Sequence, residues 1–126
     1  RELTGARPLG WYTGRDSPAE VEIGGTWLAA DAQRSPLNTE AKLLLLTQAF
    51  EQWHVFRVAI CTDARNQQSR AAIERLGAHF EGILRQHRAS TGHLTQPGTA
   101  RDTAAYSILP AEWPAIRQRL RSRLDG

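Results

Sequence analysis

The sequence holds one cysteine and no methionine among its 126 residues. Cys61 therefore has no intramolecular disulfide partner, so no oxidising compartment is implied and we expect a cytoplasmic protein. Because Cys61 lies within an apolar run, we expect a buried, inert thiol rather than a nucleophile. The chain begins at Arg1 instead of an initiator methionine, and we expect a fragment, a trimmed product or the ordered part of a longer chain.

Long apolar runs and lysine are also scarce. The longest apolar run, Leu43–Leu46, is far shorter than the roughly 20 residues of a membrane span, and no signal-peptide pattern opens the chain. Lys42 is the only lysine, so arginine carries nearly all of the positive charge, and its planar fork suits phosphate recognition. The net charge of +3 is too small to indicate a nucleic-acid-binding protein. A polyanionic small ligand is also compatible with this charge.

The residues that are present suit one domain spanning 1–126. A chain of this length buries roughly two-thirds of its unfolded surface, enough for a core without disulfides or metals. Residues 1–19 are rich in glycine and proline and show little periodicity, apart from a short strand expected near 9–12. Alternating and helical patterns predict strands at 20–28, 56–62, 80–86 and 101–109, and helices at 35–53, 67–76 and 112–124.

Capping residues support these helices. Ser35 and Pro36 suit the first helix start, Asn66 suits the N-cap of the second helix, and Gly77 suits its left-handed end. The leucine run predicts that the first helix is mostly covered and packs on the sheet. Side chains expected in the core are Leu43, Leu46, Phe50, Trp53, Trp113, Ile116 and Leu120. The element order predicts a mixed sheet with helices on both faces.

Three stretches carry a family resemblance. Residues 21–30 (VEIGGTWLAA) are a strand with a glycine pair, and residues 32–42 (AQRSPLNTEAK) are a polar loop and a helix start. Residues 63–77 (DARNQQSRAAIERLG) open a helix with Asn66 and Ser69, end it in Leu-Gly, and lead into the EGILR strand at 81–85. In this order and spacing, the stretches resemble the GCN5-related N-acetyltransferases (GNAT), most closely the branch that modifies alanine and serine ends of ribosomal proteins. Residues 101–113 look like the tail of that branch.

The resemblance implies an α/β fold with a mixed, mostly antiparallel twisted sheet and helices on both faces. In the family, a strand and two helices precede this region, and residues 1–19 are too short to supply them, so we expect the chain to lack them. Where the family's pyrophosphate loop has glycine, this chain has Pro36. Proline removes one N–H donor and fixes φ near −65°.

The resemblance also implies acetyl-CoA as co-substrate, with no metal. Pantetheine would run along the strand end at 27–30, and the pyrophosphate would lie over the N–H groups of the helix start, with charge added by Arg34 and Lys42. A plain capped helix beside a solvated loop is the alternative interpretation. The residues expected to bind the coenzyme are Trp27, Leu28, Ala29, Ala30, Gln33, Arg34, Ser35, Leu37, Asn38, Thr39, Asn66 and Ser69.

Acetyl transfer to an amine requires a base and an acid. An α-amine has a pKa of about 8, so a modest base is sufficient. Glu22 is the first candidate, acting through a water, and Glu20 is the alternate; an exposed strand face is the competing interpretation. Ser69 is the candidate acid, and its competing role is that of a first-turn helix residue. Tyr106 is a second candidate acid, although a tyrosine on an alternating strand belongs more often to the core.

The other polar residues give weaker indications of a functional site. His54, His79, His87 and His93 show no metal-ligand spacing with cysteines or carboxylates. The arginines at 117, 119, 121 and 123 recur at a spacing of two, which scatters them around a helix, so we expect a solvated surface.

The sequence therefore predicts an acetyl-CoA-dependent N-acetyltransferase. The acetyl group would pass directly to a primary amine, on a protein N-terminus or a small molecule, in a ternary complex. The alternative is a non-catalytic acyl-CoA-binding or dimerisation module of the same fold. A binder of another phosphate ligand would explain the helix start at 35–39 but not Asn66 and Ser69. We expect no membrane partner and no nucleic acid, and a homodimer stays open.

Overall fold

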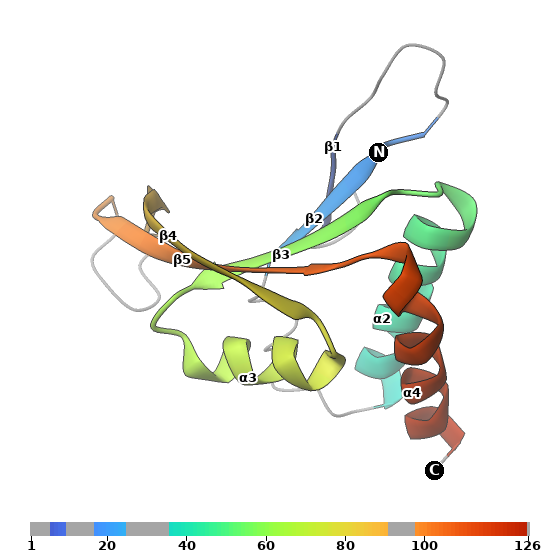
Figure 1. The fold of residues 1–126 in the computed structure, drawn as a ribbon. Helices are drawn as coiled ribbons and strands as arrows, with labels where there is room; N and C mark the ends of the chain where they lie inside the picture. The colour runs from blue at the N-terminus through green and yellow to red at the C-terminus, as the bar shows by residue number, and fades with distance from the viewer. Residues whose placement is uncertain (1–5, 10–16, 25–35, 91–97, 126) are drawn as a thin grey trace.

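The computed structural model describes residues 6–9, 17–24, 36–90 and 98–125 (Figure 1). The strands form one sheet in the order β1-β2-β3-β5-β4. Their bounds are β1 (Ala6–Leu9), β2 (Glu20–Gly24), β3 (Arg57–Asp63), β4 (His79–Ala89) and β5 (Ala100–Ile108). Strands β2 and β3 run parallel, and the other neighbours run antiparallel. This confirms the mixed, mostly antiparallel sheet.

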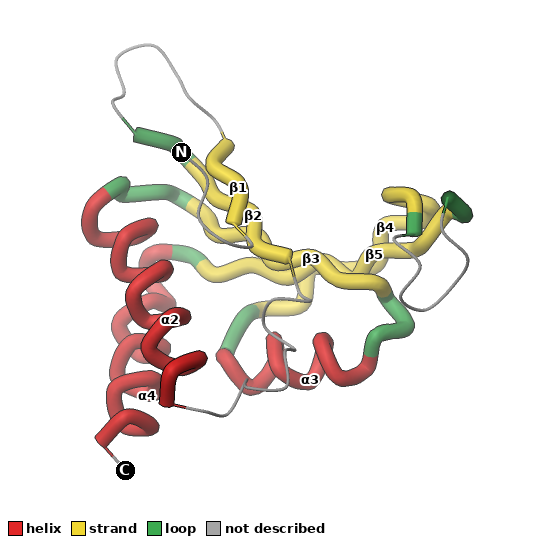
Figure 2. Tube along the Cα trace, turned by 180° about the vertical axis from the view of Figure 1, so that it is seen from behind, coloured by secondary structure: helices red, strands yellow, loops and turns green. Residues whose placement is uncertain are grey.

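Three helices pack on this sheet: α2 (Pro36–Thr47), α3 (Gln67–Leu76) and α4 (Trp113–Asp125). Both views place all three on the same side of the sheet (Figures 1 and 2). The sequence predicted helices on both faces, whereas the described helices share one face and one core. The reason is that the core residues of β2, β3 and β5 occupy alternate positions and point to one side, where they meet the apolar stripes of the helices. This core includes Val21, Ile23, Val58, Ile60, Tyr106, Leu46, Ile73 and Leu120.

Helix α2 is shorter than the predicted helix. It ends at Thr47 and continues as a π-helical turn, η1 (Gln48–Gln52). Leu45 and Leu46 are buried, but Leu44 is 65% exposed, so the leucine run is only partly covered. Four consecutive residues of an α-helix span more than one full turn, and one of them must therefore face solvent.

Helix α4 follows the short 3₁₀ turn η2 (Pro110–Glu112) and lies antiparallel to α2 and η1. The rings of Phe50 and Trp113 stack with their centroids 5.6 Å apart. The indole Nε1 of Trp113 and Nη1 of Arg117 both donate to Oε2 of Glu51, at 2.7 and 2.9 Å. These contacts bury Trp113, as predicted, and they show that the α4 arginines do more than face solvent.

Strand β4 is the edge of the sheet, and its pairing with β5 is irregular. The register shifts between Phe80 and Gly82 and again between Leu84 and Arg88. Such bulges bend a strand and redirect its side chains. In the described part of the chain, no helix has the length and apolar character needed to cross a membrane.

Candidate functional site

Most of the predicted coenzyme loop lies outside the described residues: Trp27, Leu28, Ala29, Ala30, Gln33, Arg34 and Ser35. Helix α2 begins at Pro36, which suits the first helical position because proline has no N–H to leave unpaired. Leu37 and Asn38 belong to its first turn, and Thr39 is buried. The structure thus confirms the predicted helix start next to the loop.

Asn66 and Ser69 lie together at the start of α3. The Oδ1 atom of Asn66 accepts a hydrogen bond from the Ser69 backbone N–H at 3.0 Å, which is the predicted N-cap contact. Asn66 is 9% exposed, and Ser69 is completely buried. Because the turn before Asn66 follows β3 directly, this cap sits at the C-terminal end of the parallel pair β2–β3.

Replacing Asn66 with alanine is expected to lower the free energy of unfolding by about 1 kcal/mol, because the first turn of α3 loses its cap. Asn66→Asp should retain most of that stability, since aspartate also caps. Urea titration measures both values. The exposed neighbour Gln67 supplies the control variant Gln67→Ala. An Asn66→Ala loss no larger than that of the control would contradict a stabilising role for the cap.

Glu22 lies on the sheet face opposite the helices. Its neighbours Val21 and Ile23 point into the core, and side chains alternate along a strand. Oε2 of Glu22 lies 2.6 Å from Nη2 of Arg88, and the Glu22 side chain is only 13% exposed. This ion pair holds the carboxylate in a defined position in the middle of β2.

The Glu22–Arg88 pair was not predicted from the sequence. Arg88 belongs to the edge strand β4, which is separated from β2 by β3 and β5. Three strand spacings are roughly 14 Å, farther than one arginine side chain extends. The end of β4 must therefore curl over this face of the sheet, consistent with its register shift before Arg88. Thr103 and Ser107, on the same face of β5, are buried.

Cys61 lies beside Glu22 on this face, paired across the strands with Gly24. Burial, followed by the charge of Glu22, raises the pKa of the Cys61 thiol. Cys61 is free and buried, as predicted. Its raised pKa keeps the thiol protonated at neutral pH, which disfavours its use as a nucleophile.

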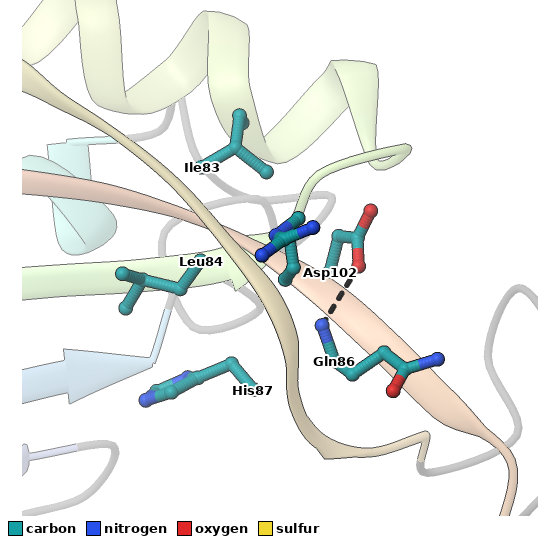
Figure 3. Close-up of a pocket in the computed structure, with 6 residues that line it drawn as sticks. Ile83, Leu84, Gln86, His87 and Asp102 are labelled. Atoms are coloured by element: carbon teal, nitrogen blue, oxygen red, sulfur yellow. Dashed lines mark hydrogen bonds between the residues drawn. The ribbon is translucent and has the colours of Figure 1, made fainter.

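Close to Arg88, β4 and β5 border an open hollow (Figure 3). It is lined by Ile83, Leu84, Arg85, Gln86, His87 and Asp102. Figure 3 shows the backbone N–H of Gln86 donating to Oδ1 of Asp102, at 2.8 Å. Gln86 has a positive φ of 46°, at the irregular part of the strand. Sequence periodicity predicted only an ordinary strand here, because a bulge leaves no clear trace in the residue pattern.

Tyr106, the second candidate acid, lies in the core between β5 and α3. Its hydroxyl donates to Oε2 of Glu74 at 2.7 Å and accepts from Nε of Arg70 at 3.0 Å. Burial raises the pKa of Tyr106, and the two partners act in opposite directions on it. These contacts favour the structural interpretation of Tyr106.

Within the described ranges, no group of three or more histidine, cysteine, aspartate or glutamate side chains could hold a metal ion. His54, His79 and His87 are exposed, and His93 lies outside those ranges. His87 contacts the Thr103 hydroxyl at 3.2 Å.

Comparisons with known proteins identify the family of the chain. Residues 3–79 match the model of the acetyltransferase (GNAT) domain. The chain is 37% identical over 94 residues to the "Putative ribosomal N-acetyltransferase YdaF" of Bacillus subtilis (strain 168), covering 75% of this chain and 48% of that protein.

Solved acetyltransferase structures are similar to the chain as well. A "putative acetyltransferase" from T. thermophilus superimposes with a TM-score of 0.69 at 39% identity, over 84% of this chain and 53% of that one. The microcin C7 self-immunity acetyltransferase MccE, solved with acetyl-CoA and AMP, gives 0.55 at 25% identity, over 72% and 47%. The chain spans about half the length of these relatives. On its sequence and its fold, the chain belongs to the GNAT acetyltransferase family.

Proposed function

We propose that this chain is an acetyl-CoA-dependent N-acetyltransferase domain. It transfers an acetyl group directly to a primary amine, a protein N-terminus or a small-molecule amine, in a ternary complex. The observation that carries this proposal is the position of Glu22. The carboxylate is held by Arg88 in the middle of β2, and Asn66 and Ser69 lie past the end of the neighbouring parallel strand, β3.

In this proposal, the coenzyme occupies the end of the β2–β3 pair. The pyrophosphate lies at the start of α2, where the first-turn N–H groups have no intrahelical partners and the helix dipole is positive. Pantetheine follows residues 27–30 toward Asn66 and Ser69. The MccE complex supports acetyl-CoA as the co-substrate, because that relative was solved with it.

The amine approaches from the face that carries Glu22. Glu22 takes its proton, directly or through a water, and Ser69 supplies a proton or a hydrogen bond to the departing thiolate. Arg88 positions the Glu22 carboxylate. An α-amine has a pKa near 8, against about 10.4 for a lysine side chain, so it loses its proton more easily and a weaker base is sufficient. We therefore favour an N-terminal amine as acceptor, and YdaF carries a ribosomal acceptor in its name.

Release of free coenzyme A thiol tests this function. The chain is incubated with acetyl-CoA and a panel of amines: peptides beginning with alanine or serine, their N-terminally blocked forms, and small primary amines. We expect thiol release with unblocked peptides and none with blocked ones. Equal, background release with every amine would contradict transferase activity.

A non-catalytic acyl-CoA-binding or dimerisation module of the same fold is the second candidate. It is favoured by Pro36 at the start of α2, where proline removes one N–H donor from the coenzyme loop. Calorimetric heat with acetyl-CoA, without thiol release on any amine, would identify this module. We also propose that the protein is cytoplasmic, because a single cysteine requires no oxidising compartment.

A further inference from the structure

Three arginine side chains lie around Glu22 and Cys61 on the sheet face opposite the helices. They are Arg57 on β3, Arg88 on β4 and Arg101 on β5. Arg88 and Arg101 are direct partners across the β4–β5 pair, so their Cα atoms are about 5 Å apart. Burial and the charge of Glu22 raise the pKa of the Cys61 thiol, and the charges of all three arginines oppose this increase. The three cations therefore share one surface with Glu22.

Two of these arginines have acidic partners. Nη1 of Arg57 lies 3.1 Å from Oε2 of Glu81, and Arg88 forms its ion pair with Glu22 at 2.6 Å. Arg101 differs from both of them, because it belongs to no ion pair among the described residues. It therefore contributes one unpaired positive charge to this surface.

Asp63 does not supply the missing partner of Arg101. Its two carboxylate oxygens accept hydrogen bonds from the backbone N, Nε and Nη2 of Arg65, at 2.9, 3.2 and 3.2 Å. Burial raises the pKa of Asp63, but these hydrogen bonds, with the charges of Arg65 and Arg101, bring it below its usual value. Arg101 is thus close enough to act on Asp63 through its charge, while Arg65 occupies the carboxylate.

The Nε atom of Arg101 is also buried without a hydrogen-bond partner. In the described part of the chain, no other buried side-chain nitrogen or oxygen is in this state. Buried donors are normally hydrogen-bonded, because an unpaired donor loses its bonds to water without replacement. The Nε–H group therefore requires an acceptor that the described residues do not provide.

We propose that Arg101 binds a carboxylate of the acceptor, so that the chain prefers amines that carry an acidic group close by. This inference rests on the proposed function, in which the amine lies against Glu22 on the same face. A singly charged, planar carboxylate matches one guanidinium fork in both charge and shape, with Nε–H and one Nη–H donating in parallel. The carboxylate belongs either to an acidic residue near a protein N-terminus or to a free amino acid.

The position of Arg101 limits where this carboxylate lies in the acceptor. Arg88 bonds to Glu22 and is the cross-strand neighbour of Arg101, so one arginine separates the proposed base from the proposed anchor. An extended peptide advances about 3.5 Å per residue. We therefore expect Arg101 to bind an acidic side chain at the second or third position of a peptide. The α-carboxylate of a free amino acid is the shorter alternative.

Steady-state thiol release with matched peptides tests this inference. Peptides with aspartate at the second or third position are compared with asparagine forms, which differ in charge but hardly in size. We expect kcat/KM to be about tenfold higher for the acidic peptides, as one charge-assisted contact provides. Arg101→Gln should lower kcat/KM about tenfold for the acidic peptides and leave it unchanged for the asparagine forms.

Two further variants support this comparison. Arg101→Lys keeps the charge but lacks the planar fork, so it should retain part of the preference for acidic peptides. The control is Arg121→Gln, which removes an exposed arginine of helix α4 and should retain the whole preference. Circular dichroism checks the fold of each variant. Arg101→Gln should fold, because the Nε atom that it removes has no hydrogen bond to lose.

Calorimetry measures acceptor binding apart from turnover. The peptides are titrated into the chain saturated with coenzyme A, which carries no acetyl group to transfer. The wild-type chain should bind the acidic peptides about tenfold more tightly than the asparagine forms, and Arg101→Gln should bind both equally. Free alanine and alaninamide are titrated in parallel. A preference for alanine alone, lost in Arg101→Gln, would support the carboxylate site and assign it to free amino acids.

The outcomes separate this inference from the proposed function. Equal kcat/KM for acidic and amide acceptors, or an acid preference that persists in Arg101→Gln, would overturn the inference and leave the transferase intact. No thiol release with any amine, together with tighter binding of acidic acceptors that Arg101→Gln abolishes, would support the carboxylate site and reject the transferase. No thiol release and equal binding of all acceptors would overturn both.

Discussion

Replacing Glu22 with glutamine is expected to lower kcat for acetyl transfer by about 10²–10⁴-fold, the usual contribution of a general base. Glutamine keeps the size of the side chain and can still contact Arg88, but it cannot accept the proton of the amine. The affinity for acetyl-CoA should change less than about twofold, because Glu22 lies on the sheet face of the acceptor in the proposed arrangement. Steady-state thiol release measures kcat, and calorimetry measures the dissociation constant of acetyl-CoA.

Two further variants sharpen this prediction. Glu20 lies two residues away on the same strand and is the alternate base, so Glu20→Gln reports which carboxylate acts. Glu40 is exposed on α2, and Glu40→Gln should leave kcat unchanged. If Glu20→Gln loses activity and Glu22→Gln does not, the base is Glu20. A large loss of coenzyme affinity in Glu22→Gln would reject its role as a base.

Replacing Lys42 with methionine is expected to stabilise the ligand-free chain at pH 7. The pKa of Lys42 is lowered from 10.5 to about 8 in the folded state, so the folded chain binds fewer protons than the unfolded chain between these values. Keeping the ammonium charged in the fold then costs on the order of 3 kcal/mol below pH 8. Methionine fills a similar volume without that charge, and the free energy of unfolding should rise by up to that amount.

The pH dependence has a definite sign. Wild-type stability from this group should increase as the pH rises from 8 to 10.5, because the unfolded chain holds the extra proton in that range. The advantage of Lys42→Met should therefore be complete below pH 8 and disappear above pH 10.5. Urea titrations at about pH 7 and about pH 10.5 measure it, with Arg121→Gln as the control for the other titrating groups. A difference that is the same at both pH values would contradict this explanation.

Features that depend on a few neighbouring residues could be predicted from the sequence. Asn66 caps α3, and Gly77 ends it with a φ of 105°. Both signals act within one helical turn, so the predicted helix agrees with the observed bounds. Val58 and Ile60 occupy alternate positions of β3 and lie in the core, as a period of two requires.

Features that depend on distant contacts could not be predicted. Glu22 and Arg88 meet only because β4 curls over the sheet. The residues next to each of them in the sequence give no indication of this contact. The shared side of the three helices is equally non-local, since a helical stripe shows that a face is buried without showing which side of a sheet covers it. The burial of Lys42 is a third case, because a lysine in a helix normally indicates a face that is exposed to solvent.

A calorimetric titration of the whole chain with acetyl-CoA tests the proposed coenzyme site most directly. We expect saturable heat with one site per chain, and competition by coenzyme A. Weaker binding of a shortened analogue, acetyl-pantetheine, should follow from the loss of its phosphates. The absence of any heat with acetyl-CoA, from a chain shown by circular dichroism to be folded, would contradict the proposed function.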